Sequence, residues 1–299
     1  MDQPPRRPRP HLLIALAALA VFVAVVAVVG ITHRLRGADL PRPAPSAASV
    51  SLPLPAPTWS ASRPTLPADV VTAWAYLDST EGNILRGGAQ DPHPLGQLVV
   101  PGIAEDYLDT LAGRGQKPNA RDVATLYAAL TGSDAAGDQL ADLAGGVDQV
   151  FPRVIGECQL TGVDLGPPRA TVLDVARYGA CLREGAIADR DTSDWVLDQM
   201  RKTAGGIGDV RGDDGGQRLA QFNATQPDGG DRMRTTCLGI GAYWSAAVVV
   251  DWPAGRGDLY GVAACAEVAR AQFPPDTQKA PAPPTPSSTC PYETCRGTD

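Results

Sequence analysis

Few side chains in this sequence have the types and spacing that enzymatic chemistry requires. The three histidines, His11, His33 and His93, lie too far apart for two of them to ligate one metal ion in a folded domain, so no metal site is predicted. A serine–histidine–aspartate triad would have to use His93, which lies between two prolines and is expected to be a solvated loop residue. No phosphate-binding or dinucleotide-binding glycine motif occurs, so no cofactor is expected.

Amines that could activate a nucleophile are equally scarce. The only lysines are Lys117, Lys202 and Lys279, and none of them follows a serine by three positions. The S-x-x-K pair, which places an amine one helical turn from a hydroxyl, is therefore absent from the chain. The triplet Lys202-Thr203-Ala204 imitates a K-T-G motif, but it closes a predicted helix well before the strands, so we interpret it as a coincidence.

An uncharged apolar run from Leu12 to Ile31 predicts a transmembrane helix, which makes the cytoplasmic membrane a partner of the chain. Its twenty residues span roughly 30 Å as a helix, the thickness of a hydrocarbon core, and exceed the apolar region of a cleavable signal peptide. Arginines flank both ends, so charge alone does not orient the helix. All six cysteines follow it, which favours a cytoplasmic tail at residues 1–11 and an extracytoplasmic domain. The net charge of −7 argues against a nucleic-acid partner.

The remainder of the chain divides by composition. Residues 37–67 are rich in proline, alanine and serine without apolar periodicity, so they are predicted to be a linker. Residues 68–273 have the size and apolar content of one globular domain. A second proline-rich stretch opens the tail 274–299, which holds Cys290 and Cys295.

The order of predicted elements in the domain sets its fold class. Strands are predicted at Val70–Leu77, Asn83–Arg86, Leu219–Asn223, Thr235–Ile240 and Ala242–Asp251. Helices are predicted at Leu95–Leu111, Ala120–Leu130, Val147–Cys158, Thr171–Leu182, Thr192–Met200 and Leu259–Gln272. A hairpin, a block of helices, three strands and a last helix indicate an α+β fold, in which an antiparallel sheet is closed by both ends of the domain and the helices form a separate lobe.

Four of the cysteines are predicted to pair within this domain. Cys158 and Cys181 lie on successive helical segments around a loop, while Cys237 lies on a strand and Cys265 on the last helix, which should pack against it. We therefore expect the disulfides Cys158–Cys181 and Cys237–Cys265. Cys290 and Cys295 are left in the tail, where they could close a small loop.

The order and spacing of several local sequences resemble those of class A β-lactamases and penicillin-binding serine hydrolases, and in particular the small actinobacterial branch. The resemblance covers Val70 to Phe273. The segments that carry it are Ala73–Asp78, Ile103–Leu108, Ser133-Asp134, Thr171–Cys181 and Asp194–Met200. It implies a β-lactamase-like fold with three catalytic motifs, S-x-x-K, S-D-N and K-T-G, around one groove.

Each of these motifs is degenerate in this chain. The groove positions that the resemblance assigns are Gln97 and Val100 for S-x-x-K, Ser133, Asp134 and Ala135 for S-D-N, and Phe222, Asn223 and Ala224 for K-T-G. The loop that holds a deacylating carboxylate in β-lactamases corresponds to Thr161–Ala170, which contains Asp164 and no glutamate. The nucleophilic serine and both motif lysines are thus missing from the positions where acyl transfer needs them, and Asp164 is the only carboxylate in the loop.

These observations predict a membrane-anchored pseudoenzyme that binds a cell-wall peptide or a protein of the envelope without acyl transfer. One alternative is a weak serine hydrolase of the same family that uses Ser133 as an unusual nucleophile. A second alternative is a purely structural envelope protein whose groove is filled by Gln97, Phe222 and Val100.

Overall fold

The computed structural model describes residues 61–208, 219–257 and 259–274 of the chain. The predicted transmembrane helix Leu12–Ile31, residues 1–11 and the tail cysteines lie outside these residues. Within the described part, no helix combines the length and the apolar character that crossing a membrane requires.

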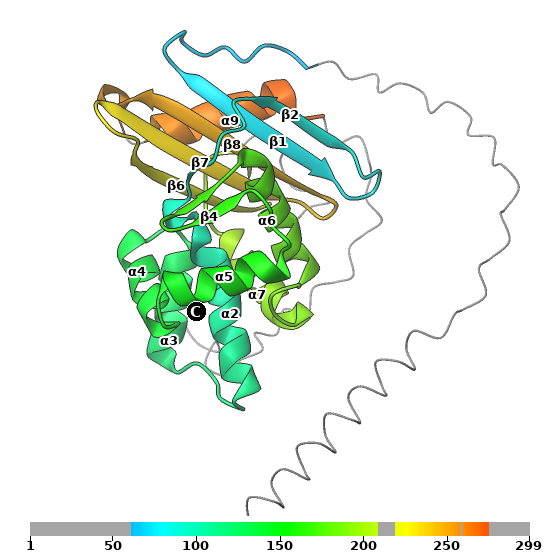
Figure 1. The fold of residues 1–299 in the computed structure, drawn as a ribbon, viewed down its shortest axis with the longest axis vertical. Helices are drawn as coiled ribbons and strands as arrows, with labels where there is room; N and C mark the ends of the chain where they lie inside the picture. The colour runs from blue at the N-terminus through cyan, green and yellow to red at the C-terminus, as the bar shows by residue number, and fades with distance from the viewer. Residues whose placement is uncertain (1–60, 209–218, 258, 275–299) are drawn as a thin grey trace, which may run out of the picture. The chain divides into compact units, whose positions relative to one another are not determined.

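A five-stranded antiparallel sheet forms the centre of the domain (Figure 1). Its strands are β1 (Val71–Asp78), β2 (Ile84–Gly88), β6 (Ala220–Pro227), β7 (Arg232–Ile240) and β8 (Trp244–Pro253). Their spatial order is β2-β1-β8-β7-β6. The first and last of these strands in the sequence, β1 and β8, therefore pair with each other. A second, three-stranded sheet has the order β3-β5-β4 and consists of β3 (His93–Pro94), β4 (Val163–Leu165) and β5 (Pro168–Ala170).

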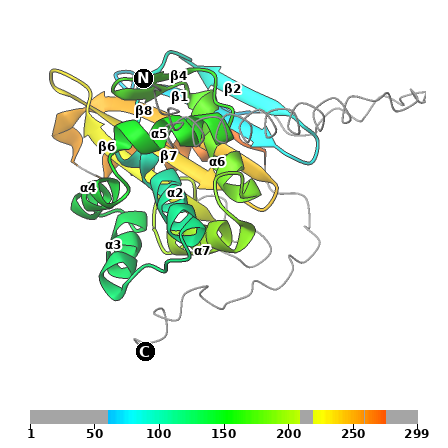
Figure 2. The same ribbon diagram turned by 60° about the horizontal axis from the view of Figure 1, so that its bottom comes forward.

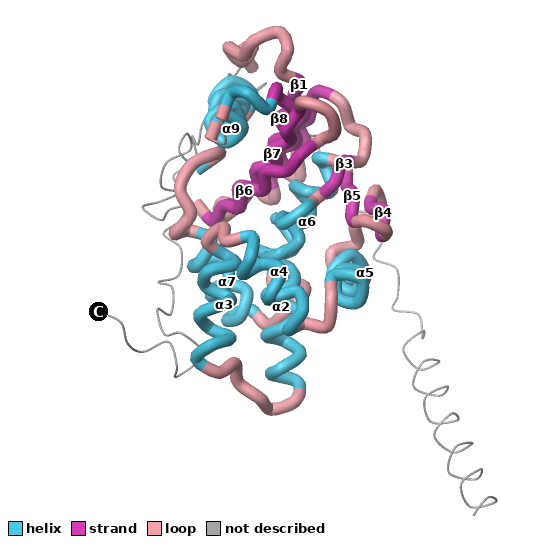
Figure 3. The backbone as a smooth tube through the Cα atoms, turned by 90° about the vertical axis from the view of Figure 1, so that its left-hand side faces the viewer, coloured by secondary structure: helices cyan, strands magenta, loops and turns pink. Residues whose placement is uncertain are grey.

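Helices cover both faces of the main sheet. The α-helices are α2 (Val100–Gly113), α3 (Ala120–Leu130), α4 (Asp134–Leu143), α5 (Val147–Glu157), α6 (Val172–Glu184), α7 (Arg190–Met200) and α9 (Tyr260–Gln272), with short 3-10 helices η1 (Gly96–Val99) and η2 (Ala254–Arg256). Helix α9 packs on one face against β7 and β8, and α6 packs on the other face against β1 and β8 (Figure 3). The remaining helices form a lobe beyond α6.

The predicted α+β order of elements is confirmed. The hairpin β1–β2, the start of α3 at Ala120 and the strands β6 to β8 lie where the sequence pattern predicts them. Asn119 caps α3 through a capping box with Asp122, and the Thr171 hydroxyl accepts a hydrogen bond from Asp174 N at the start of α6. Helix α4 and the small sheet were not predicted.

Two hydrophobic clusters stabilise the domain, one on each face of the sheet. The larger cluster joins the helical lobe to the inner side chains of the strands, including Phe222 and Val249. The smaller cluster lies under α9 and contains Trp252 and Phe273. Both predicted cysteine pairs are at disulfide distance: Cys158–Cys181 joins the end of α5 to α6, and Cys237–Cys265 joins β7 to α9.

The segment before β1 lies along α9. Ser62 N donates a hydrogen bond to Ala271 O at 2.9 Å, and Thr65 N donates to a Glu267 carboxylate oxygen at 3.3 Å. Asp69 pairs with Arg256 at 2.6 Å. Because the partner numbers fall as the chain advances, the segment runs antiparallel to α9, and residues from the end of the predicted linker contact the folded domain.

His93 corrects one expectation, since it is a buried residue and not a solvated loop residue. Its side chain is 5% exposed on β3, and its Nε2 makes no hydrogen bond with any described residue. Burial and the nearby Arg234 guanidinium lower its pKa to about 4. His93 pairs with Ala170 in the small sheet β3-β5-β4, and its buried ring stays neutral at neutral pH.

Glu105 is a buried carboxyl group in the helical lobe. It lies on α2, is 0% exposed, and neither carboxyl oxygen makes a hydrogen bond with a described residue. Burial raises its pKa to about 8; the nearby Ser193 hydroxyl opposes this shift, and the carboxylates of Asp189 and Asp194 add to it. The carboxyl group therefore stays protonated at neutral pH.

This buried acid predicts a pH dependence of stability. An unfolded glutamate ionises near pH 4.5, so between pH 4.5 and 8 the folded state holds a proton that the unfolded state has lost, and stability falls as the pH rises. Glu105→Gln should remove the contribution of this carboxyl group to the pH dependence. Between pH 4.5 and 8, the fall of unfolding free energy with pH should become shallower by up to about 1.4 kcal/mol per pH unit. Denaturant unfolding at several pH values measures the slope. The exposed Glu81→Gln is the matched control, and an unchanged slope in Glu105→Gln would contradict the assignment.

Candidate functional site

The structure places the three degenerate motif positions on η1 and α2, on α4, and on β6. Gln97 lies on η1 and Val100 opens α2, while Ser133 to Ala135 open α4 and Phe222 to Ala224 lie in the middle of β6. Helix η1 packs against β6, and α2 lies between α4 and α7 (Figure 2). The segment that holds Gln97 and Val100 therefore contacts both α4 and the strand β6.

A buried tyrosine holds the start of α2 in place. The Tyr178 hydroxyl on α6 accepts a hydrogen bond from Gly102 N at 2.5 Å and donates one to Val99 O at 3.3 Å. A Cβ atom at Gly102 would lie 2.7 Å from this hydroxyl and 3.0 Å from Val154, so glycine is required there. Burial raises the pKa of Tyr178, which keeps the hydroxyl protonated and able to donate.

Gln97, at the nucleophile position, links η1 to α4. Its Nε2 donates a hydrogen bond to Asp138 Oδ1 at 2.9 Å, and its Oε1 lies against the backbone of Gly137, where a Cβ atom would collide with it. An amide has no nucleophilic hydroxyl or thiol, so this side chain cannot form an acyl intermediate. Its contacts are those of a residue that joins two helices.

Ser133, the remaining hydroxyl of the degenerate S-D-N motif, caps a helix. Its Oγ accepts a hydrogen bond from Ala136 N at 3.4 Å, which makes Ser133 the N-cap of α4 and Asp134 the first residue of that helix. Ser133, Asp134 and Ala135 are exposed, and no described basic residue or histidine pairs with the Ser133 hydroxyl. Nothing in this geometry activates the hydroxyl.

Phe222 on β6 and Val100 on α2 are core side chains. Each side chain is 2% exposed, and both belong to the large hydrophobic cluster together with Leu98 and Ala224. The side chain of Gln226, farther along β6, donates a hydrogen bond to Pro94 O at 2.7 Å. This bond links β6 to the residues that directly precede η1. The positions that correspond to a lysine on a helix and a lysine on a strand are therefore apolar core.

Asn223 points to the opposite side of β6. It is half-buried, its Oδ1 makes no hydrogen bond with a described residue, and it lies beside Gly206 in the loop after α7. The neighbouring Gln221 binds this loop on the same side, since its Nε2 donates to Thr203 O at 2.7 Å and its Oε1 accepts from Gly208 N at 2.9 Å. Strand alternation thus separates Asn223 from Phe222 and Ala224.

Other candidate chemical groups have structural partners. Lys202 donates a hydrogen bond to Gln199 Oε1 at 2.7 Å and lies 5.2 Å from the centre of the Tyr127 ring. The Lys202-Thr203-Ala204 triplet follows the end of α7 at Met200. Asp164 is exposed on β4. Among the described residues, no three histidine, cysteine, aspartate or glutamate side chains gather in a way that could hold a metal ion.

Sequence reasoning missed the residues that support these positions. Asp138 lies on the unpredicted helix α4, and Tyr178 lies on a predicted helix but reaches the backbone of α2, 76 residues away. Ser133 followed by Asp134 and a run of alanine and leucine was a signal for the start of α4. No local pattern indicates the partner of Tyr178 or of Gln226.

Comparison with solved structures shows a fold like that of class A β-lactamases and penicillin-binding proteins, which confirms the predicted resemblance at the level of the fold. The TLA-3 extended-spectrum β-lactamase is 12% identical, with 68% of this chain and 92% of that chain covered and a TM-score of 0.57. For PBP-A the identity is 19%, the coverage 69% and 90%, and the TM-score 0.53. The transpeptidase domain of the FtsI4 D,D-transpeptidase from Legionella pneumophila is 15% identical, with 68% of this chain and 87% of that chain covered and a TM-score of 0.50. The sequence matches no family model and no curated protein.

If Phe222 is a core residue, truncating it should destabilise the domain strongly. Phe222→Ala removes a ring that is 2% exposed and is expected to cost about 3 to 5 kcal/mol of unfolding free energy. Asn223→Ala on the same strand is the control, with an expected cost below about 1 kcal/mol because its buried Oδ1 accepts no hydrogen bond there. Denaturant unfolding of both variants makes the comparison. Equal small losses would mean that the Phe222 ring is not a core side chain.

Proposed function

We propose that this protein is a membrane-anchored member of the β-lactamase-like fold that does not carry out acyl transfer and acts by binding a protein of the cell envelope. The observation that carries the proposal is the burial of Phe222 and Val100 in one apolar cluster at the positions that correspond to two lysines. Acyl transfer needs a nucleophile, a base and oxyanion donors that act together. Gln97, Val100 and Phe222 provide none of these groups.

The same packing favours an envelope protein over a cell-wall peptide as the binding partner. A peptide in the family's groove would have to lie against the inner side of β6 near η1. Phe222 occupies that side of the strand, and the Gln97–Asp138 hydrogen bond joins η1 to α4 beside it. A protein partner needs only the outer surface of the domain. The purely structural alternative and the binding proposal therefore both predict that no peptide lies against β6 beside Phe222.

The hydrolase alternative has less support. Ser133 is the only candidate hydroxyl at a motif position, and its Oγ accepts the capping hydrogen bond of α4. A serine becomes nucleophilic when a neighbouring base takes its proton. The described contacts of Ser133 include no such base.

Anchoring is supported by the sequence. The apolar run Leu12–Ile31 is long enough to span a bilayer, and the predicted linker 37–67, whose end lies along α9, would separate this run from the domain. Two cysteine pairs at disulfide distance are those expected of a domain that folds in an oxidising compartment. Together these features support a cytoplasmic N-terminus and an extracytoplasmic domain.

The absence of acylation is tested directly with penicillin. After long incubation of the purified chain with a reactive penicillin, intact mass spectrometry should show no covalent adduct. One structural neighbour, a PBP-A variant, is described as an acyl-enzyme complex with penicillin G, so PBP-A is a suitable positive control. A stoichiometric addition to the chain, on Ser133 or any other residue, would falsify the pseudoenzyme proposal and favour the hydrolase.

Partial restoration of the motif should also fail to produce an adduct. Gln97→Ser supplies a hydroxyl with no amine beside it, and Val100→Lys buries an unpaired amine at a cost of several kcal/mol. The double variant still lacks the lysine-bearing strand, because Phe222 stands there. The same mass measurement applies to all three variants, each checked first for folding by thermal unfolding. Rapid acylation of the double variant would show that the groove is open.

The proposed topology has its own test. Alkaline phosphatase fused after Phe273 should be active, because the enzyme forms its disulfides only outside the cytoplasm. A fusion after Arg9, in the predicted cytoplasmic tail, should be inactive. Because the Arg9 fusion precedes the transmembrane segment, it is the inactive control, and an inactive Phe273 fusion would place the domain in the cytoplasm.

A further inference from the structure

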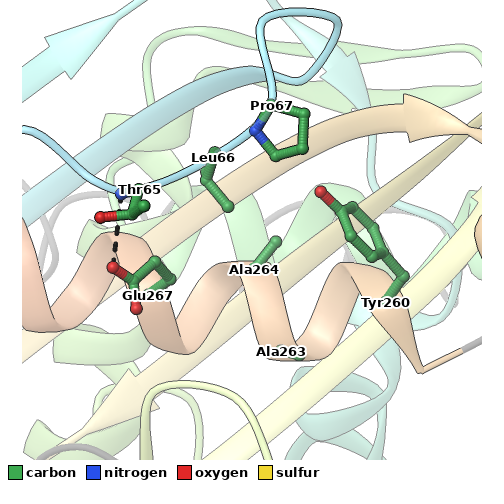
Figure 4. A pocket seen from close by; sticks show the side chains of 7 residues that line it. All are labelled: Thr65, Leu66, Pro67, Tyr260, Ala263, Ala264 and Glu267. Atoms are coloured by element: carbon green, nitrogen blue, oxygen red, sulfur yellow. Dashed lines mark hydrogen bonds between the residues drawn. The ribbon is translucent and has the colours of Figure 1, made fainter.

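A shallow groove lies between α9 and the segment that precedes β1. Residues Thr65, Leu66, Pro67, Tyr260, Ala263, Ala264 and Glu267 line it (Figure 4). Its volume is about 300 Å³. The hydrogen bond from Thr65 N to Glu267 closes one end, while the rings of Pro67 and Tyr260 border the other. Most of this lining is apolar.

The outer face of α9 extends this apolar surface beyond the groove. Leu259, directly before the helix, is 80% exposed, which is the largest exposure among the large hydrophobic side chains of the described residues. Leu259, Ala263 and Glu267 are spaced four residues apart, so they share one face of the helix. Ala263 is exposed as well. This face therefore carries two exposed apolar side chains, Leu259 and Ala263, beside the Glu267 carboxylate.

The size of the groove restricts what can cover it. A stable interface between two proteins buries roughly 1,200 Å² or more, far beyond what seven residues around such a small groove provide. A segment of the same chain needs much less contact, because a short tether holds it at a millimolar effective concentration. The geometry therefore favours an occupant that is attached to α9 itself.

We propose that the proline-rich segment Ala280–Pro286 of the C-terminal tail docks in this groove. Its sequence is Ala-Pro-Ala-Pro-Pro-Thr-Pro, and such segments favour the polyproline II conformation, which binds grooves lined by aromatic and aliphatic side chains at little entropic cost. Tyr260, Leu66 and Pro67 supply such a lining. The groove carries no cation that would require an acidic ligand, and Ala280–Pro286 carries no charge.

The tether has the length that this docking needs. Helix α9 ends at Gln272, and Phe273 and Pro274 follow it. From Pro274 back to Ala264 the distance along the helix is roughly 15 Å at 1.5 Å per residue. The six residues from Pro274 to Ala280 reach up to roughly 20 Å when extended. Ala280–Pro286 can therefore return along α9 and lie beside Leu66.

Proteolysis at Lys279 tests the docking on the full chain in detergent. Lys279 directly precedes the proposed ligand, so docking should slow cleavage by a lysine-specific protease at the Lys279–Ala280 bond. Ala263→Arg places a long charged side chain in the groove, and Pro283→Ser with Pro284→Ser weakens the ligand without touching the folded domain. Each change should speed cleavage about tenfold, which corresponds to a ligand of roughly 0.1 mM affinity at a millimolar effective concentration. Mass spectrometry after reduction follows the released fragment.

The matched control is Ala124→Arg, which adds the same side chain to an exposed position on α3. It should leave the cleavage rate unchanged. Equal rates in all variants would overturn the proposal. Protection that disappears on dilution of the unmodified chain would also overturn it, because a second copy would then be the occupant. Thermal unfolding of Ala263→Arg confirms that its fold is intact, and the proline variant gives the answer independently if it is not.

Discussion

The buried hydroxyl of Tyr178 is the interaction on which the arrangement of the motif positions depends. It joins α6, which lies on the sheet, to the backbone at Val99 and Gly102, where η1 passes into α2. A buried backbone N–H without a partner costs one or more kcal/mol, so this junction keeps its position only while the tyrosine supplies both hydrogen bonds. Gln97 lies on η1 and Val100 is the first residue of α2. Their location relative to β6 therefore follows from the position of this helix junction.

The packing around that junction is apolar at Val100 and Leu98. A lysine at position 100 would be an amine in an apolar cluster, which is tolerated only beside partners that accept its protons. Val100, Phe222 and Leu98 instead contribute apolar surface to the cluster. Gln97 turns its amide toward Asp138 on α4. Each substitution is thus matched by its neighbours.

Local sequence predicted the elements better than the contacts between them. The hairpin, the cap at Asn119 and the strands of the main sheet have short-range signals, namely alternation, turns and capping residues. The prediction that His93 is a solvated loop residue was wrong. The flanking prolines indicate a loop, whereas the burial of His93 within the small sheet is a tertiary effect. Helix α4 was missed because Ser133 was interpreted as part of a catalytic motif and not as an N-cap. The contact of Tyr178 with Gly102 joins segments 76 residues apart, which no local pattern reveals.

The two faces of the sheet have different consequences for function. On the inner face, the cluster around Phe222 is packed apolar core, so a ligand could bind there only if that core opened. On the outer face, α9 is tied to β7 by Cys237–Cys265, and the exposed side chains of Leu259 and Ala263 lie at its start. Opening the inner face removes packing from many side chains at once, whereas covering α9 only adds contacts to a fixed helix. The outer face therefore offers binding at lower free-energy cost than the groove that gives the fold family its chemistry.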